Sequence, residues 1–352
     1  MRVQEVNSAL MQSARADRVK GYVPAIDAPT TPSPAPAVAK KPMLWWAGWI
    51  ATGSLLAVIL LRVVWHDGLW PLLIFNAYAW LLFAPAWLIA PLAWWRKRHR
   101  MALAAAICAG WHLVHVVPSF VAAEPPPPAN ERRLRVVDAN LLTSNQRPET
   151  LLDELLAHDA DVMILQEVSP VWVYVLRERG VLDDYPHQLI ESRADAFGAA
   201  ILSRIEPREA EIQMVDGLPW PRMVVPFGTA SIELLCVHTL PPRTSEYVQG
   251  HLRQLDALAD WALRDGATRI VAGDLNSTVW SRFHARMDER FDDAWNLAGE
   301  GFGFTWPNGL FTLPPARLDH VYLSRDLTVT NIQVGTGTGS DHRPLLLEIA
   351  ER

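Results

Sequence analysis

Hydrophobic and polar residues follow two different patterns along the chain, and the change falls near residue 124. Before it, three long apolar runs occupy about 43–65, 69–95 and 101–123. Each run has close to the ~20 residues that a helix needs to cross a bilayer core of roughly 30 Å. After it, short apolar stretches alternate with stretches of helical periodicity. The pattern predicts three transmembrane helices within 43–123, followed by an α/β domain over 132–352.

The segments that flank these helices have their own composition. Residues 1–42 are rich in Ala and Pro, which predicts a disordered tail, and the Pro-rich segment 124–131 predicts a stiff linker. Lysines precede the first apolar run, and a basic cluster, Arg96–Arg100, separates the second from the third. Positive charge favours the cytoplasmic face of a membrane. We therefore expect a cytoplasmic N-terminus and a multi-pass protein of the inner (plasma) membrane, with its C-terminal domain in the periplasm.

The domain over 132–352 mixes strands with helices. Apolar stretches predict strands at Leu134–Ala139, Val162–Leu165, Gly198–Leu202, Met223–Val225, Ile232–Val237, Arg269–Ala272, His320–Leu323 and Leu345–Ile349. Helical periodicity predicts helices at Glu149–His158, Pro170–Arg179 and Glu246–Arg264. Connections of mixed length favour a layered α/β fold over a strictly parallel, doubly wound sheet.

Charge and cysteine content narrow the function classes. From residue 131 onward the chain has 21 Arg, no Lys and 33 Asp and Glu, a formal charge of −12. This part therefore has no strong basic surface for non-specific binding of duplex DNA. The two cysteines, Cys108 and Cys236, lie in different predicted regions and form no metal-binding spacing.

Polar side chains that could carry chemistry follow the predicted strands. A carboxylate, amide or imidazole occurs at six strand ends: Asp138 to Asn140, Gln166-Glu167, His238, Asp274 to Asn276, Asp319-His320 and Asp341-His342. Any one of these groups could be a cap or a turn former, but α/β scaffolds gather functional groups at strand ends. Together they suit hydrolysis of phosphate esters with a divalent metal.

This ordered set resembles the endonuclease/exonuclease/phosphatase superfamily, which includes DNase I, exonuclease III and neutral sphingomyelinases. The matching pieces cover the whole domain: Asn140, Gln166-Glu167, 197–204, Val237-His238, 273–276, 317–320 and 340–342. The resemblance implies a four-layer sandwich in which two mixed β-sheets pack face to face, with helices outside and the site at one edge.

The resemblance also implies a Mg²⁺ or Mn²⁺ cofactor. Glu167 would be the chief ligand, Asn140 would contribute its amide oxygen, and Asp341 would bind the same ion or a second one. The number of ions stays open. A hard cation of this kind prefers oxygen ligands and keeps several waters.

Five further positions match catalytic positions of the superfamily. Asp274 would orient or deprotonate the attacking water, and Asn276 would hold that water or a phosphate oxygen. His342 would stabilise charge on the phosphoryl group, and Asp319 would fix its tautomer. His238 would be a second donor or the acid for the leaving group.

Several other residues are expected to have structural roles. Asp138, Asp161 and His320 belong here, with Asp138 left open as an accessory ligand. The aromatic loop 301–307 is either a core plug or a wall of the substrate pocket. Candidates for phosphate contact, each more easily explained as a structural arginine, are Arg193, Arg222, Arg243 and Arg317.

The sequence thus predicts a membrane-anchored, metal-dependent phosphodiesterase or phosphomonoesterase, with the lipid bilayer as a partner through its helices. Two substrates compete: extracytoplasmic DNA or RNA, disfavoured by the negative charge, and the headgroup of a lipid, favoured by the membrane tether. A tethered binding module without catalysis is the alternative from another class.

Overall fold

The computed structural model describes residues 41–67, 70–121, 132–228, 230–264, 266–309 and 313–352. Residues 1–40 of the tail predicted over 1–42, and the linker predicted over 124–131, lie outside the described residues, whereas Lys41 and Pro42 begin the first described helix. The chain divides into two compact units, Met1–Trp45 and Trp46–Arg352. All interactions discussed below lie within the second unit.

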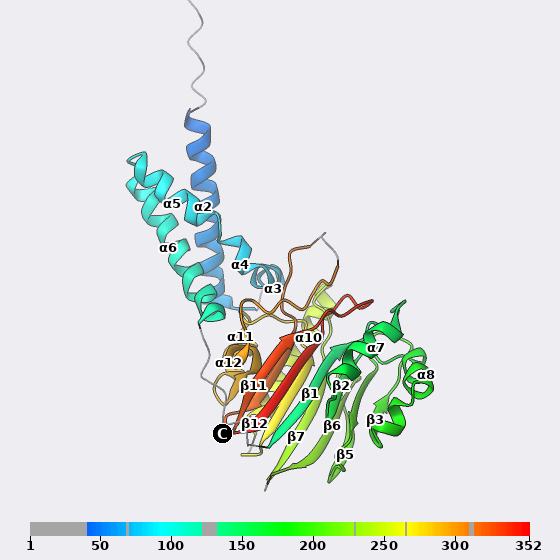
Figure 1. Cartoon of the computed structure of the whole chain (residues 1–352). Helices are drawn as coiled ribbons and strands as arrows, with labels where there is room; N and C mark the ends of the chain where they lie inside the picture. The colour runs from blue at the N-terminus through cyan, green and yellow to red at the C-terminus, as the bar shows by residue number, and fades with distance from the viewer. Residues whose placement is uncertain (1–40, 68–69, 122–131, 229, 265, 310–312) are drawn as a thin grey trace, which may run out of the picture. The chain divides into compact units, whose positions relative to one another are not determined.

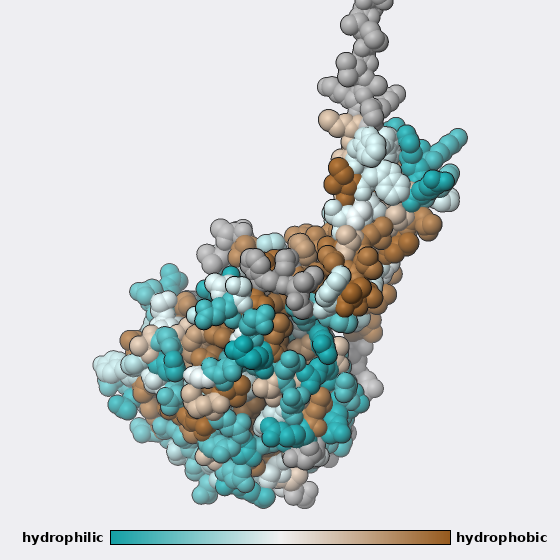
Figure 2. Space-filling view, turned by 180° about the vertical axis from the view of Figure 1, so that it is seen from behind, coloured by the Kyte–Doolittle hydropathy of each residue, from teal (hydrophilic) through white to brown (hydrophobic). Residues whose placement is uncertain are grey.

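The apolar N-terminal region forms helices, but not three spanning ones. Two segments, Met43–Trp65 and His99–Phe120, are long and apolar enough to cross a membrane, whereas Ala79–Trp95 is shorter. Figure 2 shows hydrophobic side chains gathered over part of this helical region. The elements in order are α2 (Lys41–Trp65), α3 (Trp70–Ala77), α4 (Ala79–Leu82), α5 (Ala86–Trp95), α6 (His99–Val116) and the 3₁₀ helix η1 (Val117–Phe120).

The predicted spanning helix over 69–95 is therefore wrong. The chain breaks after Ala77, and again between Leu82 and Ala86. Pro85 has no N–H to continue the helical ladder. The Ala84 N–H instead reaches back three residues to the Leu81 carbonyl, at 3.1 Å, in a tight turn.

Two six-stranded mixed sheets form the core of the C-terminal domain (Figure 1). The first has the strand order β11-β12-β1-β2-β4-β3, and the second β5-β6-β7-β8-β10-β9. Strand bounds are β1 (Arg133–Asn140), β2 (Val162–Gln166), β3 (His187–Glu191), β4 (Ala199–Ser203), β5 (Glu209–Val215), β6 (Leu218–Phe227), β7 (Ala230–His238), β8 (Arg269–Asp274), β9 (Phe291–Asp293), β10 (Asp319–Ser324), β11 (Leu327–Val334) and β12 (Leu345–Glu351).

Helices cover the outer face of each sheet, and their bounds are α7 (Pro148–Ala157), α8 (Pro170–Glu178), α9 (Val181–Asp184), α10 (Ser245–Ala262) and α11 (Arg282–Met287). The short helix α12 (Ala294–Ala298) instead packs Ala294 and Trp295 into the cluster between the sheets. One apolar cluster lies between the sheets, and two more lie under the helices on the outer faces. Within β1, Leu134 and Val136 enter the central cluster, while Val137 and Ala139 pack under helices. This is the period of two that a strand buried on both faces requires. The predicted four-layer sandwich is confirmed.

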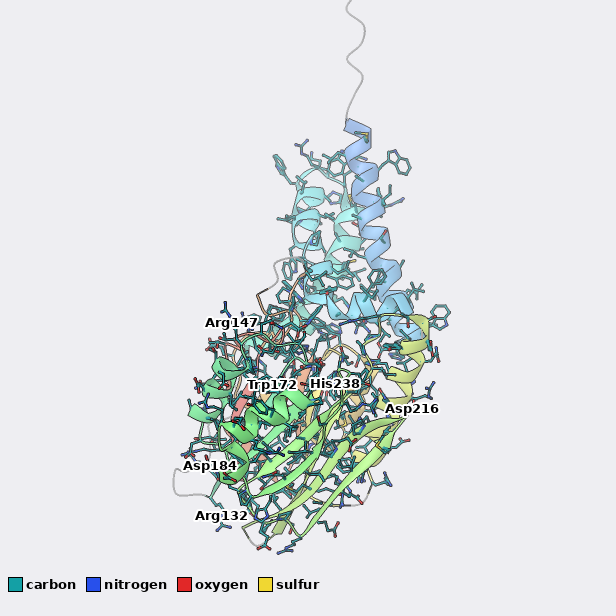
Figure 3. The ribbon with its side chains drawn as sticks, turned by 90° about the vertical axis from the view of Figure 1, so that its right-hand side faces the viewer. Arg132, Arg147, Trp172, Asp184, Asp216 and His238 are labelled. Carbon is teal, nitrogen blue, oxygen red and sulfur yellow. The ribbon has the colours of Figure 1, made fainter. Side chains whose placement is uncertain are left out.

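Strand pairing brings the polar strand ends to one edge. β1 is parallel to β2, and β7 is parallel to β8, so the carboxyl ends of these strands lie together. β10 is antiparallel to β8 and begins opposite the end of β8, with Asp319 paired to Asp274. Figure 3 shows His238 at the upper end of the strands, level with Trp172 of α8.

Candidate active site

The end of β8 is the centre of the candidate site. In the register of the second sheet, Asp274 lies between His238 of β7 and Asp319 of β10. Gly273 allows the close approach of β7, because a Cβ added there would lie 1.9 Å from the Val237 carbonyl oxygen. This gives the Gly-Asp pair a physical reason: only glycine fits immediately before the carboxylate.

The Asp274 carboxylate collects several polar groups. Its Oδ2 lies 3.5 Å from Nε2 of His238 and 3.5 Å from Nε2 of His342. The Asn140 side-chain amide donates to the same oxygen at 3.1 Å, and the Asn276 backbone N–H donates to Oδ1 at 2.9 Å. Asp274 is 2% exposed, so these contacts replace most of its hydration.

His342 lies between two carboxylates. Its Nδ1 is 2.8 Å from Oδ2 of Asp319, while its Nε2 faces Asp274. Burial acts to lower the pKa of His342, but Asp319 and Asp274 outweigh it and raise the pKa to about 10. Burial likewise acts to raise the pKa of Asp319, yet the imidazolium keeps that pKa below its usual range. The pair is therefore an imidazolium and a carboxylate at neutral pH.

His238 and Asp274 have the opposite tendencies. Burial lowers the pKa of His238, although Asp274 opposes the change, so this imidazole is neutral at pH 7. Burial also raises the pKa of Asp274, against the effect of His342. The site thus holds one charged and one neutral imidazole, both facing a carboxylate with increased proton affinity. Neighbouring groups whose pKa values are driven apart are typical of acid–base chemistry.

Glu167 and Asp341 are the carboxylates available to a cation. Both line the cavity, and Oδ1 of Asp341 is buried without a hydrogen-bond partner in the described part of the chain. Glu167 follows β2 at a left-handed φ of 59°, which turns its side chain out of the strand. Its Oε2 accepts from the Thr143 backbone N–H at 2.8 Å. Two carboxylates facing a polar cavity fit the hard-oxygen requirement of Mg²⁺ or Mn²⁺.

Asn140 is held by hydrogen bonds at both ends of its side-chain amide. Its Oδ1 accepts from the Leu142 backbone N–H at 3.1 Å, and its Nδ2 donates to Glu167 at 3.3 Å and to Asp274 at 3.1 Å. A backbone N–H can only donate, so this contact fixes which end of the amide is oxygen. Asn140 thus joins the two carboxylates as a donor, and its role as a metal ligand through the second lone pair of Oδ1 stays a prediction.

These residues surround a cavity of about 560 Å³. Glu167, Asp274, Asp341, His238 and His342 form its polar end. Asn276, at a left-handed φ of 47°, also lines it, while its side-chain amide donates to the Thr239 carbonyl at 2.9 Å. Of the eight predicted site residues, six reach this cavity, and Asn140 and Asp319 support them from behind.

Comparison with known proteins gives the family. The sequence profile of the Endonuclease/Exonuclease/phosphatase family matches residues 121–342, which contain all eight predicted site residues. The chain belongs to this family. It is therefore a hydrolase of phosphate ester bonds, in a superfamily that is generally dependent on divalent metals. No curated protein is found to match the sequence.

Solved structures agree with the family fold. D. rerio TDP2 complexed with a single-strand DNA product is 20% identical, with a TM-score of 0.52, over 62% of this chain and 99% of that one. Caenorhabditis elegans TDP2 is 19% identical, with a TM-score of 0.51, over 62% and 97%. An endonuclease/exonuclease/phosphatase from Beutenbergia cavernae is 17% identical, with a TM-score of 0.50, over 62% and 72%. At these identities the likeness concerns the fold alone.

The arginine candidates separate clearly in this family member. Arg193 pairs with Asp195, Arg222 with glutamates of the second sheet, and Arg317 with Asp293 at 2.8 Å. Arg243 alone among the four lines the cavity. The first three thus form structural ion pairs, and Arg243 is the one of the four placed to contact a phosphate in the cavity.

The residues expected to be structural have identifiable partners. Asp138 is fully buried and accepts from Gln166 at 2.8 Å, and burial raises its pKa well above the usual range. A protonated carboxyl is a poor accessory ligand. Asp161 accepts from the Arg135 backbone N–H at 2.8 Å. Nε2 of His320 contacts the Ser277 carbonyl at 3.0 Å, just after the Asp274 to Asn276 loop.

The aromatic loop 301–307 contributes to the cavity and packs on the N-terminal region, while its Phe302 and Phe304 are only partly buried and are in none of the core clusters of the catalytic domain. Trp306 lines the cavity, and its Nε1 donates to Asp341 at 3.3 Å. Phe302 and Phe304 instead pack on Trp80, with ring centroids 5.5 Å and 5.1 Å away. Sequence reasoning missed that Trp80 belongs next to the site, because nothing in the pattern links two segments so far apart in the chain.

Proposed function

We propose that the protein is a membrane-associated phosphodiesterase that uses Mg²⁺ or Mn²⁺ and attacks phosphorus in line with water. The observation that carries this proposal is the position of Asp274, within 3.5 Å of both His238 and His342, at the polar end of a cavity that also exposes Glu167. Phosphoryl transfer requires positioning and charge stabilisation more than covalent chemistry, and this arrangement supplies both.

The cofactor would be held by the oxygens of Glu167 and Asp341. When bound, it would offset negative charge on the phosphate and lower the pKa of bound water. Asn140 would keep Glu167 and Asp274 at a fixed separation through its two donor contacts. Trp306 would hold Asp341 in place through the hydrogen bond that its indole N–H donates to the carboxylate.

The remaining chemistry is assigned to the chain's own groups. Asp274, with its raised pKa, would accept a proton from the attacking water. Asn276, whose backbone N–H donates to Asp274, would orient that water. His342, an imidazolium paired with Asp319, would stabilise charge that develops on phosphoryl oxygens. His238 is neutral, which favours the role of a hydrogen-bond donor to phosphate over that of a strong leaving-group acid.

A location outside the cytoplasm remains our proposal. α2 and α6 both contact Trp280 near their C-terminal ends. Arg62 of α2 donates to the Trp280 carbonyl at 2.7 Å, and the Trp280 indole donates to the carbonyl of His115 in α6 at 3.4 Å. The two helices therefore run in the same direction, with the basic residues 96–100 at the opposite end of α6. By the positive-inside tendency, the catalytic domain would face away from the cytoplasm.

A nuclease is the second candidate, favoured by the complex of D. rerio TDP2 with a single-strand DNA product. A small phosphodiester has one phosphate to be bound, whereas a nucleic acid has many. A cavity lined by one arginine suits a small phosphodiester better than a nucleic acid.

The test uses the full chain in detergent with bis(p-nitrophenyl) phosphate. We expect hydrolysis that requires Mg²⁺ or Mn²⁺ and stops with EDTA, and a loss of at least about 10²-fold in Asp274→Asn. Asp184→Asn, which changes an exposed carboxylate of α9 outside the cavity lining, is the matched control. Hydrolysis that survives both chelation and Asp274→Asn would refute the assignment.

A further inference from the structure

One wall of the catalytic cavity comes from the apolar N-terminal region. Leu73, Ile74, Asn76 and Ala77 of α3, together with Tyr78, line the same cavity as Asp274 and His342. These residues precede the first strand of the catalytic domain by more than fifty positions. No assigned step of the hydrolysis uses them, so their contribution to the cavity needs a separate explanation.

The residue just before helix α3, Asp67, is hydrogen-bonded to the segment that follows β8. Oδ2 of Asp67 accepts from the Arg282 backbone N–H at 2.6 Å, and Asp67 also pairs with the Asn76 side chain. Arg282 begins α11, only eight residues after Asp274. The position of α3 is thereby coupled to the loop that carries Asp274 and Asn276.

Just after α3, helix α4 contacts the loop that carries Trp306. The Trp80 indole donates to the Pro315 carbonyl at 3.0 Å, and its ring packs on Phe302 and Phe304. Phe302 also packs on Phe120 at the end of the N-terminal region, with centroids 5.0 Å apart. Contacts on both sides therefore hold α3 as a fixed wall of the site, not as a segment that happens to lie nearby.

The cavity lining also contains apolar side chains, which we call the apolar wall. Ile74 and Leu313 remain 45% and 47% exposed, Pro241 lines the cavity too, and the Phe197 ring packs on the His238 ring with centroids 5.4 Å apart. Among the described lining residues, Arg243 is the one arginine and there is no lysine. Such a cavity is complementary to a molecule with one phosphate next to an apolar group, and it offers little to a chain of phosphates.

The apolar wall is continuous with helix surface suited to lipid. Phe75 and Leu81, on either side of Tyr78, are 37% and 44% exposed, and α2 and α6 are long enough to span a bilayer. A lipid in that bilayer could reach the cavity without its chain crossing water, whereas a free polar ester gains nothing from α3. The bilayer is therefore the favoured source of the apolar group.

We propose that α3 is part of the substrate site and selects a membrane-lipid phosphoester, whose acyl chain lies against Ile74 and Leu313 while its phosphate lies at Asp274 and His342. This rests on the proposed phosphodiesterase function. Asn76 and Tyr78, at the boundary between the polar and apolar walls, would contact the ester region.

The experiment compares two phosphodiesters that differ only in chain length, methyl p-nitrophenyl phosphate and hexadecyl p-nitrophenyl phosphate, with the full chain in mixed micelles. We expect kcat/KM for the hexadecyl ester to exceed that for the methyl ester at least tenfold. In Ile74→Asn this ratio should fall about tenfold, mainly through KM. Leu88→Asn, at a 76% exposed position of α5 outside the cavity lining, should keep the wild-type ratio.

Leu313→Asn tests a second apolar lining residue, outside α3, in case Ile74→Asn disturbs the helix. It should also lower the ratio of kcat/KM for the hexadecyl ester to that for the methyl ester. The proposal is overturned if wild type shows no preference for the long chain, if Leu88→Asn lowers the ratio as much as Ile74→Asn, or if single-strand DNA is cleaved faster than the hexadecyl ester. Metal-dependent hydrolysis of the methyl ester alone would keep the phosphodiesterase assignment and remove the lipid one. Hydrolysis of neither ester would remove both.

Discussion

Replacing Asp319 with asparagine should change the pH dependence of the enzyme more than its shape. Asp319 is 1% exposed, and its Oδ2 lies 2.8 Å from Nδ1 of His342. The rise in the pKa of His342 from 6.5 to about 10 corresponds to roughly 5 kcal/mol in favour of its charged form. Asp319 is the larger of the two favourable charges, followed by Asp274. Without it, the effect of burial on the pKa of His342 is opposed mainly by Asp274, with a smaller contribution from Asp341.

The expected magnitude follows from the fraction of imidazolium. With a pKa of about 10, more than nine-tenths of His342 is charged at pH 8.5. With an ordinary pKa of 6.5, about one molecule in a hundred would be charged there. If the imidazolium stabilises the transition state, kcat/KM of Asp319→Asn should fall about 10²-fold between pH 6 and pH 8.5. In the wild-type enzyme, titration of His342 should change kcat/KM very little between pH 6 and pH 8.5.

The assay is a pH–rate profile for bis(p-nitrophenyl) phosphate, with Asp184→Asn as the control and Asp319→Glu as a variant that restores the charge. Stability is measured alongside, because a raised folded-state pKa stabilises the fold below the unfolded pKa and loses this contribution as pH rises through about 10. An Asp319→Asn enzyme with a wild-type profile from pH 6 to pH 8.5 would refute the role given to the charged His342.

Three further predictions concern the metal, the core and the topology. Glu167→Gln removes the main carboxylate facing the cavity, so the metal concentration for half-maximal activity should rise at least tenfold in a titration with Mn²⁺. Leu234→Ala deletes a fully buried side chain between the sheets and should cost about 2–5 kcal/mol in denaturant unfolding, whereas Met214→Ala, at a 60% exposed position, should change stability by less than about 0.5 kcal/mol. An alkaline phosphatase fused to the C-terminus should be active in intact cells, and activity confined to a cytoplasmic reporter would contradict the proposed orientation.

The hydrophobic pattern predicted the central strands of each sheet and missed the edge strands. All eight predicted strands exist, and the four missing ones, β3, β5, β9 and β11, are the four edge strands. Along β5 every residue is exposed or partly exposed, and β3 has no fully buried residue. An edge strand needs less apolar surface because one side has no neighbour and the outer layer is incomplete there. A pattern method therefore loses the edges first.

The chemical identity of the site was predictable, but its protonation states were not. Motif positions located Asp274, His238 and His342. Strand register explains why Asp274 meets His238 and Asp319, whereas His342 reaches this group from the loop before β12, through its contact with Asp319. Whether an imidazole is charged depends on the distance and burial of its carboxylate partners, which no local sequence records. The orientation of Asn140 similarly depends on the Leu142 N–H, two residues beyond the end of β1.

The apolar run over 69–95 shows the limit of hydropathy most directly. Leucine, isoleucine and phenylalanine satisfy the same pattern whether they face lipid, pack in a core or line a cavity, so the run predicted one spanning helix. In the structure it is divided at Tyr78 and near Pro85, and within its described residues the part up to Tyr78 lines the cavity. The decisive signals are two polar residues, Asp67 just before α3 and Asn76 within it, whose partners include Arg282, more than two hundred positions away. A polar pair that interrupts apolar segments is costly in a membrane unless it is satisfied. At this position it is satisfied by the loop that follows Asp274, which is why a segment that resembles a membrane anchor also lines the cavity of the candidate site.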